Sequence, residues 1–292
     1  MYSAISKNKR NTVIIMAVFL LLIGGLGWIA GMAYQDYSIT IIVLVVALLY
    51  STIQYFAASK TAIILNGGRE ITKKDCPELW NIVENLAISE GMPMPRVFII
   101  DDPAPNAFAT GRDPKHAYVA ATTGILDIMT KRELNAVMAH EMSHVKNYDI
   151  RVNMIVFGLV GAISFIADML LRMSFYSDDK DQSSRNGVFM LIGVFAAIIA
   201  PIVALLTQLA ISRQREYLAD ASSALTTRDP EALADALEKL KSNARPMRRQ
   251  NTATAHLFFN NPMKSGFLTK LFSTHPPLDD RIARLRSNIN KM

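Results

Sequence analysis

Cysteine and charged residues are both scarce in this chain. Cys76 is the only cysteine among 292 residues, so no disulfide can form within the chain, which fits a catalytic part in the cytoplasm. Charged residues make up 19% of the sequence and apolar residues 51%, a high apolar fraction for a soluble enzyme. The net charge of +6 comes without a basic stripe that is interleaved with aromatic residues, so we expect no nucleic-acid partner.

The scarcity of charge is concentrated in four long apolar segments. Segments 12–33, 39–59 and 188–211 contain no charged residue, and segment 152–171 contains only Asp168. Each is long enough to cross a hydrocarbon core of about 30 Å as a helix, and soluble helices of this length normally carry a polar stripe. The first segment is too long for the apolar core of a signal peptide, so we expect a retained anchor. The sequence thus predicts four spans in two hairpins.

Basic residues predict the orientation of these spans. Lys7, Lys9 and Arg10 precede the first span, the link between the first two spans carries only Asp36, and the tail from Ser212 onward has more basic than acidic residues. By the positive-inside rule, the N-terminus, the segment after the second span and the tail face the cytoplasm. Part of the positive charge would then lie against anionic lipid.

The hairpins alternate with two polar segments, which contain the catalytic candidates. The expected division is a hairpin at 1–59, a first half-domain at 60–151, a second hairpin at 152–211 and a second half-domain at 212–292. Hydrophobic periodicity and turn residues predict a helix from Pro77 to Gly91, a strand in "MPRVFII" and two strands joined by a turn in "NAFATGRDPKHAYVAAT". Further helices are predicted at 130–147, at 230–241 and after Pro277.

The helix at 130–147 carries the strongest chemical motif. Thr130 and Glu133 form a capping box at its start. His140 and His144 are four residues apart, so both project from one face, where two imidazoles can hold one zinc ion. Glu141 lies beside the first histidine and can act as a general base without binding the metal, as in the H-E-x-x-H pattern. The alternative is a solvated helix face with two incidental histidines.

A catalytic zinc ion needs a third protein ligand and an open fourth position. The stretch "SRQREYLADASSAL" places Glu216 and Asp220 on one face of a predicted helix. Glu216 would complete a His₂Glu set, and Asp220 could orient a histidine ligand through a hydrogen bond. Alone, this pair is typical of a solvated helix face, but together with H-E-x-x-H it predicts a metal site. The sequence gives no role to Asp149.

These motifs, with "NAFATG" and "THPPLDDRI", resemble the HtpX-type membrane zinc endopeptidases, which are relatives of the eukaryotic CAAX-processing metalloproteases. The resemblance extends over nearly the whole chain. It implies a membrane α-helical protein with a mixed α+β, gluzincin-like zinc metalloprotease domain. It also implies one Zn²⁺ ion bound by His140, His144 and Glu216, with Glu141 as the general base. Asp220 would not bind the metal but would orient one of the histidine ligands.

The resemblance gives roles to two further motifs. "NAFATG" resembles the edge strand of the family's active site, which can hold an extended peptide by main-chain hydrogen bonds. His275 and Arg281 match a pair that stabilises the oxyanion of the tetrahedral intermediate in the relatives. The candidate substrate-binding residues in the strand are Asn106, Ala107, Phe108 and Ala109.

The positions of the ligands predict where substrates are cleaved. His144 lies just before the third span and Glu216 just after the fourth, while the charged residues of the H-E-x-x-H helix would be costly in lipid. We therefore expect an endopeptidase at the cytoplasmic face of a bacterial cell membrane. Its expected partners are the lipid bilayer and polypeptides, chiefly misfolded or damaged membrane proteins, as in proteolytic quality control under stress. The alternatives are a CAAX-type prenyl-protein protease and a non-catalytic membrane scaffold that contains zinc.

Overall fold

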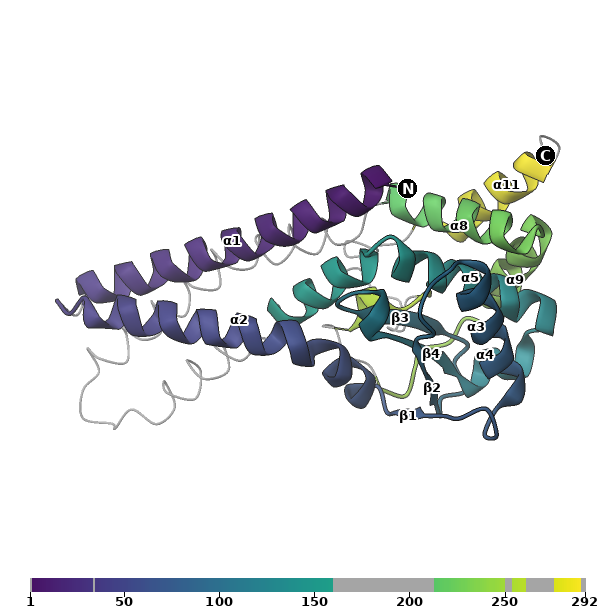
Figure 1. Cartoon of the computed structure of the whole chain (residues 1–292), viewed down its shortest axis with the longest axis horizontal. Coiled ribbons are helices and arrows are strands. Elements are labelled where there is room, and N and C mark those ends of the chain that lie inside the picture. The colour runs from purple at the N-terminus through teal and green to yellow at the C-terminus, as the bar shows by residue number, and fades with distance from the viewer. Residues whose placement is uncertain (1, 34, 160–212, 250–253, 261–275, 290–292) are drawn as a thin grey trace.

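The computed structural model describes residues 2–33, 35–159, 213–249, 254–260 and 276–289. Two long helices, α1 (Tyr2–Ala33) and α2 (Ser38–Leu65), pack side by side and project from a compact part that holds the sheet and the other helices (Figure 1). The predicted span at 188–211 and residues 160–171 of the predicted third span lie outside the described residues. Residues 149–159 are helical.

Both helices of the first hairpin are long and apolar enough to cross a membrane. The qualifying stretches are Ile5–Gly25 and Thr40–Leu65, with mean hydropathies of 1.3 and 2.1. Large apolar side chains on them are open to the surroundings, for example Leu21 at 76% and Ile41 at 65% exposure. Lipid tolerates such exposure and water does not, so the hairpin suits a bilayer. α2 continues to Leu65, beyond the expected hairpin boundary at residue 59.

A mixed sheet of four strands forms the centre of the compact part. Its order is β1-β2-β4-β3, in which β2 and β4 are parallel and the other pairs are antiparallel. The strands are β1 (Gly68–Glu70), β2 (Arg96–Ile100), β3 (Ala107–Gly111) and β4 (Ala117–Thr122). The turn between β3 and β4 needs glycine, because Gly111 has a φ of 154° and a Cβ there would lie 2.6 Å from the His116 carbonyl oxygen. The three predicted strands β2, β3 and β4 are confirmed.

Alternate residues of the strands enter two different cores, as a period of two requires. Val97, Val119 and Ala121 face the core that α3, α5 and α9 share. Phe98, Phe108 and Ala120 face a second core, which also contains Ala62 and Ile63 of α2. The membrane hairpin and the sheet are therefore joined by continuous apolar packing rather than by a flexible link.

Helix α5 is the central helix of the compact part. It packs against α3, α8, α9 and β3 (Figure 1). Among the described residues, besides the helical stretch 149–159, the helices outside the hairpin are α3 (Pro77–Ser89), α4 (Thr123–Ile128), α5 (Lys131–Lys146), α8 (Arg213–Thr227), α9 (Pro230–Ser242) and α11 (Leu278–Ile289), with 3-10 turns η1 (Pro114–His116) and η2 (Ala255–Leu257). The helices predicted at 77–91, 130–147, 230–241 and after Pro277 are confirmed, as is the capping box of Thr130 and Glu133.

Candidate metal centre

The histidine pair lies on the buried face of α5. His140 and His144 are one turn apart, and their side chains are 1% and 12% exposed. The Nε2 atoms point toward each other and lie 3.1 Å apart. A helix projects residues i and i+4 from the same face, so this approach follows directly from the spacing in the sequence.

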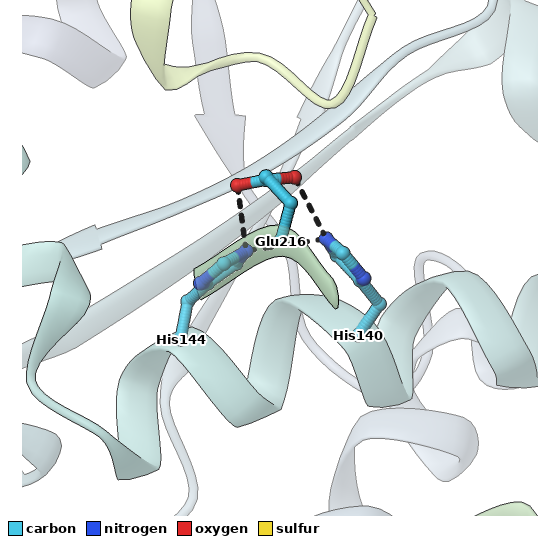
Figure 2. A group of neighbouring side chains, drawn as sticks. All are labelled: His140, His144 and Glu216. Atoms are coloured by element: carbon cyan, nitrogen blue, oxygen red, sulfur yellow. Dashed lines mark hydrogen bonds and ion pairs between the residues drawn. The ribbon is translucent and has the colours of Figure 1, made fainter. Parts of the chain in front are cut away.

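Helix α8 adds a carboxylate to the pair. It packs along α5, where Ser223 Oγ donates to the Ala136 carbonyl at 2.7 Å. The Glu216 oxygens lie 3.7 Å from His140 Nε2 and 3.6 Å from His144 Nε2. One donor atom from each of the three residues lies within 4.8 Å of the others, and all three residues are buried, His144 the least (Figure 2). The structure thus brings together the three residues predicted as metal ligands, from two helices far apart in the sequence.

Each imidazole is held from behind by a carboxylate. His140 Nδ1 lies 3.0 Å from Asp220 Oδ1, and His144 Nδ1 lies 2.9 Å from Asp149 Oδ2. A carboxylate accepts the Nδ1 proton, which leaves the lone pair of each histidine on Nε2. Two Nε2 lone pairs and the Glu216 carboxylate then converge and repel one another unless they share a cation. The donor set therefore fits a divalent metal ion.

The charges around the pair also favour a cation. Burial lowers the pKa of His144, but the hydrogen bond to Asp149 and the charges of Glu216, Asp149 and Glu141 outweigh it and raise this pKa to about 9. The same negative potential would attract a metal ion to the two Nε2 atoms.

Arg281 of α11 is completely buried behind His140. Its Nη2 and Nε donate to the two oxygens of Asp220 at 2.6 and 2.9 Å. Burial disfavours the guanidinium charge, but Asp220 outweighs it and raises the pKa of Arg281 above its ordinary value. The guanidinium therefore clamps the carboxylate that holds His140, a contact the sequence did not reveal. Its predicted partner, His275, lies outside the described residues.

The Nη1 atom of Arg281 is not used by this clamp. It lies 3.9 Å from Glu216 Oε2 and has no hydrogen-bond partner among the described residues. One donor of the guanidinium is thus directed to the metal-binding side of the site.

Glu141 is 3% exposed and follows His140 on α5. Burial is the largest influence on its carboxyl group and raises its pKa. The charges of His140 and His144 and a backbone hydrogen bond from Ala109 oppose this effect without cancelling it. A glutamate with a raised pKa holds a proton more readily than an exposed one, as a general base and acid requires.

Strand β3 lies at the edge of the sheet as expected, but the start of its free edge is occupied. The Phe259 amide donates to the Ala107 carbonyl at 2.8 Å. The Asn106 side chain donates to the Asn260 carbonyl at 2.7 Å and accepts from the Asn260 amide at 3.0 Å. All residues of β3 are buried. Asn106 and Ala107, two of the candidate substrate-binding residues, therefore pair with the 254–260 segment.

The other two candidate residues of β3, Phe108 and Ala109, point their main chains to opposite edges of the strand. Phe108 is fully buried, and its ring packs against Phe258 at a centroid distance of 4.8 Å. Ala109 has the same orientation as Ala107, since residues two apart in a strand expose their main chain on the same edge. The backbone amide of Ala109 donates a hydrogen bond to the Glu141 carboxylate.

Two residues near the candidate metal centre were given no role by the sequence analysis. Asp149 supports His144, and its only signal was its position five residues after that histidine. The Phe259 ring packs edge-on against His140 at 4.8 Å and lies 4.7 Å from Arg281 Cζ. No spacing in the sequence links Phe259 to α5, because the contact joins distant segments.

Comparison with known proteins gives the family. The model of peptidase family M48 matches residues 73–289. A "Protease HtpX homolog" of Tropheryma whipplei is 54% identical over 291 residues, covering 100% of this chain and 99% of the relative. One of Ligilactobacillus salivarius is 46% identical over 292 residues, covering 98% and 99%.

A solved structure shares the fold. The crystal structure of S. mikatae Ste24p has a TM-score of 0.52 and 21% identity, and the likeness covers 96% of this chain and 67% of that chain. The family match and the full-length relatives agree with the histidine–glutamate cluster and the apolar hairpin. The chain therefore belongs to peptidase family M48 and is a membrane metalloprotease.

Proposed function

We propose that this protein is a zinc-dependent endopeptidase that cleaves polypeptides at the cytoplasmic face of the membrane. His140, His144 and Glu216 are the proposed ligands of one Zn²⁺ ion. The observation that carries the proposal is the convergence of these donors, with both imidazoles fixed at Nδ1 by carboxylates. Two histidines and one glutamate are a typical ligand set of catalytic zinc, which keeps one position open.

Glu141 is the proposed general base. When bound, zinc would polarise the scissile carbonyl and make a water molecule more acidic. Glu141 would take a proton from the attacking water and pass it to the leaving amine. Its burial, which raises the pKa of its carboxyl group, suits it to hold that proton between the two steps.

Arg281 and His275 are the proposed donors to the oxyanion. The Nη1 atom of Arg281 supports this role, because the other two guanidinium nitrogens are engaged by Asp220 and this one is directed toward Glu216. A buried donor that points to developing negative charge stabilises it strongly, because water does not screen the interaction.

The proposed substrate-binding edge begins at Ala109. Asn106 and Ala107 already bind the 254–260 segment. The main chain of Phe108 faces β4, where Phe108 pairs with Ala120, and not the free edge. An extended peptide added to β3 beyond this segment would bind main chain to main chain and place its carbonyl group near Glu141. Main-chain recognition makes few demands on sequence, which suits an enzyme for loosely folded substrates.

The proposed substrates are misfolded or damaged membrane proteins, in quality control under stress. The apolar hairpin supports an active site close to the membrane, where such substrates would be met. The contact of the N-terminal part of α1 with the loop after α5 also supports this. That contact supports a metal site on the same side of the membrane as Lys7, Lys9 and Arg10, and the positive-inside rule favours the cytoplasm for that side.

Chelation and re-metallation test the proposal. The purified full-length chain in detergent should cleave casein, lose activity with a zinc chelator and regain it with zinc. A prenylated CAAX peptide in the same assay should not be cleaved at a comparable rate. Cleavage of casein that a chelator does not affect would refute the zinc mechanism, and preferred cleavage of the prenylated peptide would favour the CAAX-type alternative.

The proposed side of the membrane needs a separate experiment. In inverted membrane vesicles, an added protease should remove the 276–289 segment, whereas in right-side-out vesicles the segment should stay protected. The opposite pattern would place the active site on the outer face.

A further inference from the structure

Asn8, in the N-terminal part of α1, reaches the loop that follows the H-E-x-x-H helix. It is 3% exposed, although Lys7 and Lys9 beside it are exposed. Its side-chain amide donates to the Asn147 carbonyl at 2.9 Å and to Asp149 Oδ1 at 2.6 Å. A single amide group thus uses both of its protons on that loop.

The contact continues to the metal centre. Asp149 Oδ2, the second oxygen of the carboxylate that Asn8 holds, lies 2.9 Å from His144 Nδ1. We propose that Asn8 is a positioning residue of the metal centre, which fixes Asp149 and through it His144, so that the membrane helix α1 forms part of the zinc site. This inference rests on the zinc-protease function proposed above.

Among the described residues, Asn8 donates to Oδ1 of Asp149 at 2.6 Å. The carboxylate is 2% exposed, and a buried carboxylate oxygen needs donors to replace water. Arg215 Nη1 is the other group nearby, but it lies 3.9 Å from Asp149 Oδ1 against 2.6 Å for Asn8. With one oxygen held by Asn8 and the other by His144, the carboxylate cannot rotate away from the imidazole.

The backbone of the same loop gives independent support. Tyr148 has a φ of 61°, a left-handed conformation that residues with a side chain disfavour. Two cations, Lys9 Nζ and Arg151 Cζ, each lie over its ring at 4.8 Å from the centroid. The left-handed residue turns the chain so that Asp149 faces back to His144. α1 therefore holds this turn at two points, through Asn8 and Lys9.

The central test replaces the amide of Asn8 by a carboxylate of the same shape. In the full-length chain in detergent, stripped of metal and titrated with zinc against a chelating indicator, Asn8→Asp should lower zinc affinity by about 10–100-fold, the usual effect of losing such a support. Asn8→Ala, which avoids the new charge, should lose about 10-fold. Ser6→Ala, on the exposed side of the same turn, is the matched control and should match the parent. Asn8 variants that bind zinc like this control would refute the inference.

A double variant separates positioning from simple docking of α1. Asn8→Asp combined with Asp149→Asn exchanges the two groups, so that residue 149 can still accept from His144 and now donates to residue 8. Zinc affinity should then exceed that expected from multiplying the two single losses. If the loss of zinc affinity in the double variant equals the product of the two single losses, Asn8 only anchors α1, and the inference is overturned.

His144→Ala distinguishes this inference from the proposed function. If the parent binds zinc and His144→Ala does not, the zinc site stands, whatever the Asn8 variants show. If both bind zinc equally, the site itself is refuted, and the Asn8 inference fails with it.

Discussion

The two histidines of the metal centre are supported in different ways. His140 is 1% exposed, and its Asp220 is clamped by Arg281, a fully buried cation from the C-terminal part of the chain. His144 is 12% exposed, and its Asp149 is held by the neutral amide of Asn8 from the membrane helix α1. The first imidazole–carboxylate distance is 3.0 Å and the second 2.9 Å, so the two sides differ in what lies behind the carboxylates.

This difference lies in the charge of the donor and not in burial of the carboxylates, because Asp220 and Asp149 are 4% and 2% exposed. On the His140 side, Asp220 and Arg281 are both deeply buried, and neither charge would be stable there without the other. On the His144 side, a neutral donor suffices because Asp149 already lies close to a histidine and, more distantly, to Arg215. The first support is thus internal to the protease domain, whereas the second depends on the position of the membrane helix.

Both histidines are expected to serve one reaction, in which Glu141 is the base, and substitution of Glu141 has the largest expected effect. Glu141→Gln should lower kcat by about 10²–10⁴-fold, because the amide cannot take the proton of water. Zinc binding should be unchanged, since Glu141 is not a proposed ligand. Casein cleavage and zinc content measured on the same preparation check both points. Cleavage at the parent rate with zinc bound would refute Glu141 as the general base.

The next largest effect concerns the charged support. Arg281→Met removes the partner of buried Asp220 and should lower stability by about 3–5 kcal/mol, as when one member of a buried ion pair is lost. Arg286→Met is the matched control, because Arg286 lies on the same helix and pairs with exposed Glu231 and Glu238. The control should unfold close to the parent midpoint in detergent. Equal midpoints for both variants would show that the buried Arg281–Asp220 pair stabilises the fold no more than an exposed pair does.

Two single substitutions compare the supports directly. Asp220→Asn and Asp149→Asn each keep the shape of the side chain and weaken the hydrogen bond to a histidine. Each should lower zinc affinity by about 10–100-fold. The loss should be larger for Asp220→Asn, because it also leaves Arg281 as a buried, unpaired charge. Competition with a chelating indicator gives both values, and the reverse order would contradict the asymmetry.

The sequence predicted the candidate metal ligands, the candidate base and one of the two carboxylates behind the histidines, and it gave no role to the other. His140, His144, Glu141 and Glu216 could be identified because helical spacing brings residues four apart onto one face, and because a zinc site needs a third ligand. The same reasoning found Asp220. These are short-range patterns, which a single sequence contains.

The other supports of the histidines depend on contacts that no local pattern reveals. Asp149 reaches His144 only because Tyr148 adopts a left-handed conformation, which the sequence "NYD" does not require. Asn8 and Asp149 are 141 residues apart, and Phe259 meets β3 across a similar distance in sequence. For the fold, periodicity and turn residues predicted three of the four strands and most helices correctly, but not the short strand β1. The occupied edge of β3 was missed because it arises from tertiary packing.

The smallest expected effect tests whether metal affinity merely follows the stability of α5. Thr130 caps the start of this helix, accepting from the Glu133 amide at 3.3 Å, far along the helix from His140. Thr130→Ala should cost about 1 kcal/mol of stability, the usual value for a lost N-cap. Zinc affinity should stay at the parent value, because the supports of the two histidines come from α8, α11, α1 and the loop after α5. If Thr130→Ala weakened zinc binding as much as Asp149→Asn, affinity would report only the integrity of the helix, and the difference between the two supports would have no functional meaning.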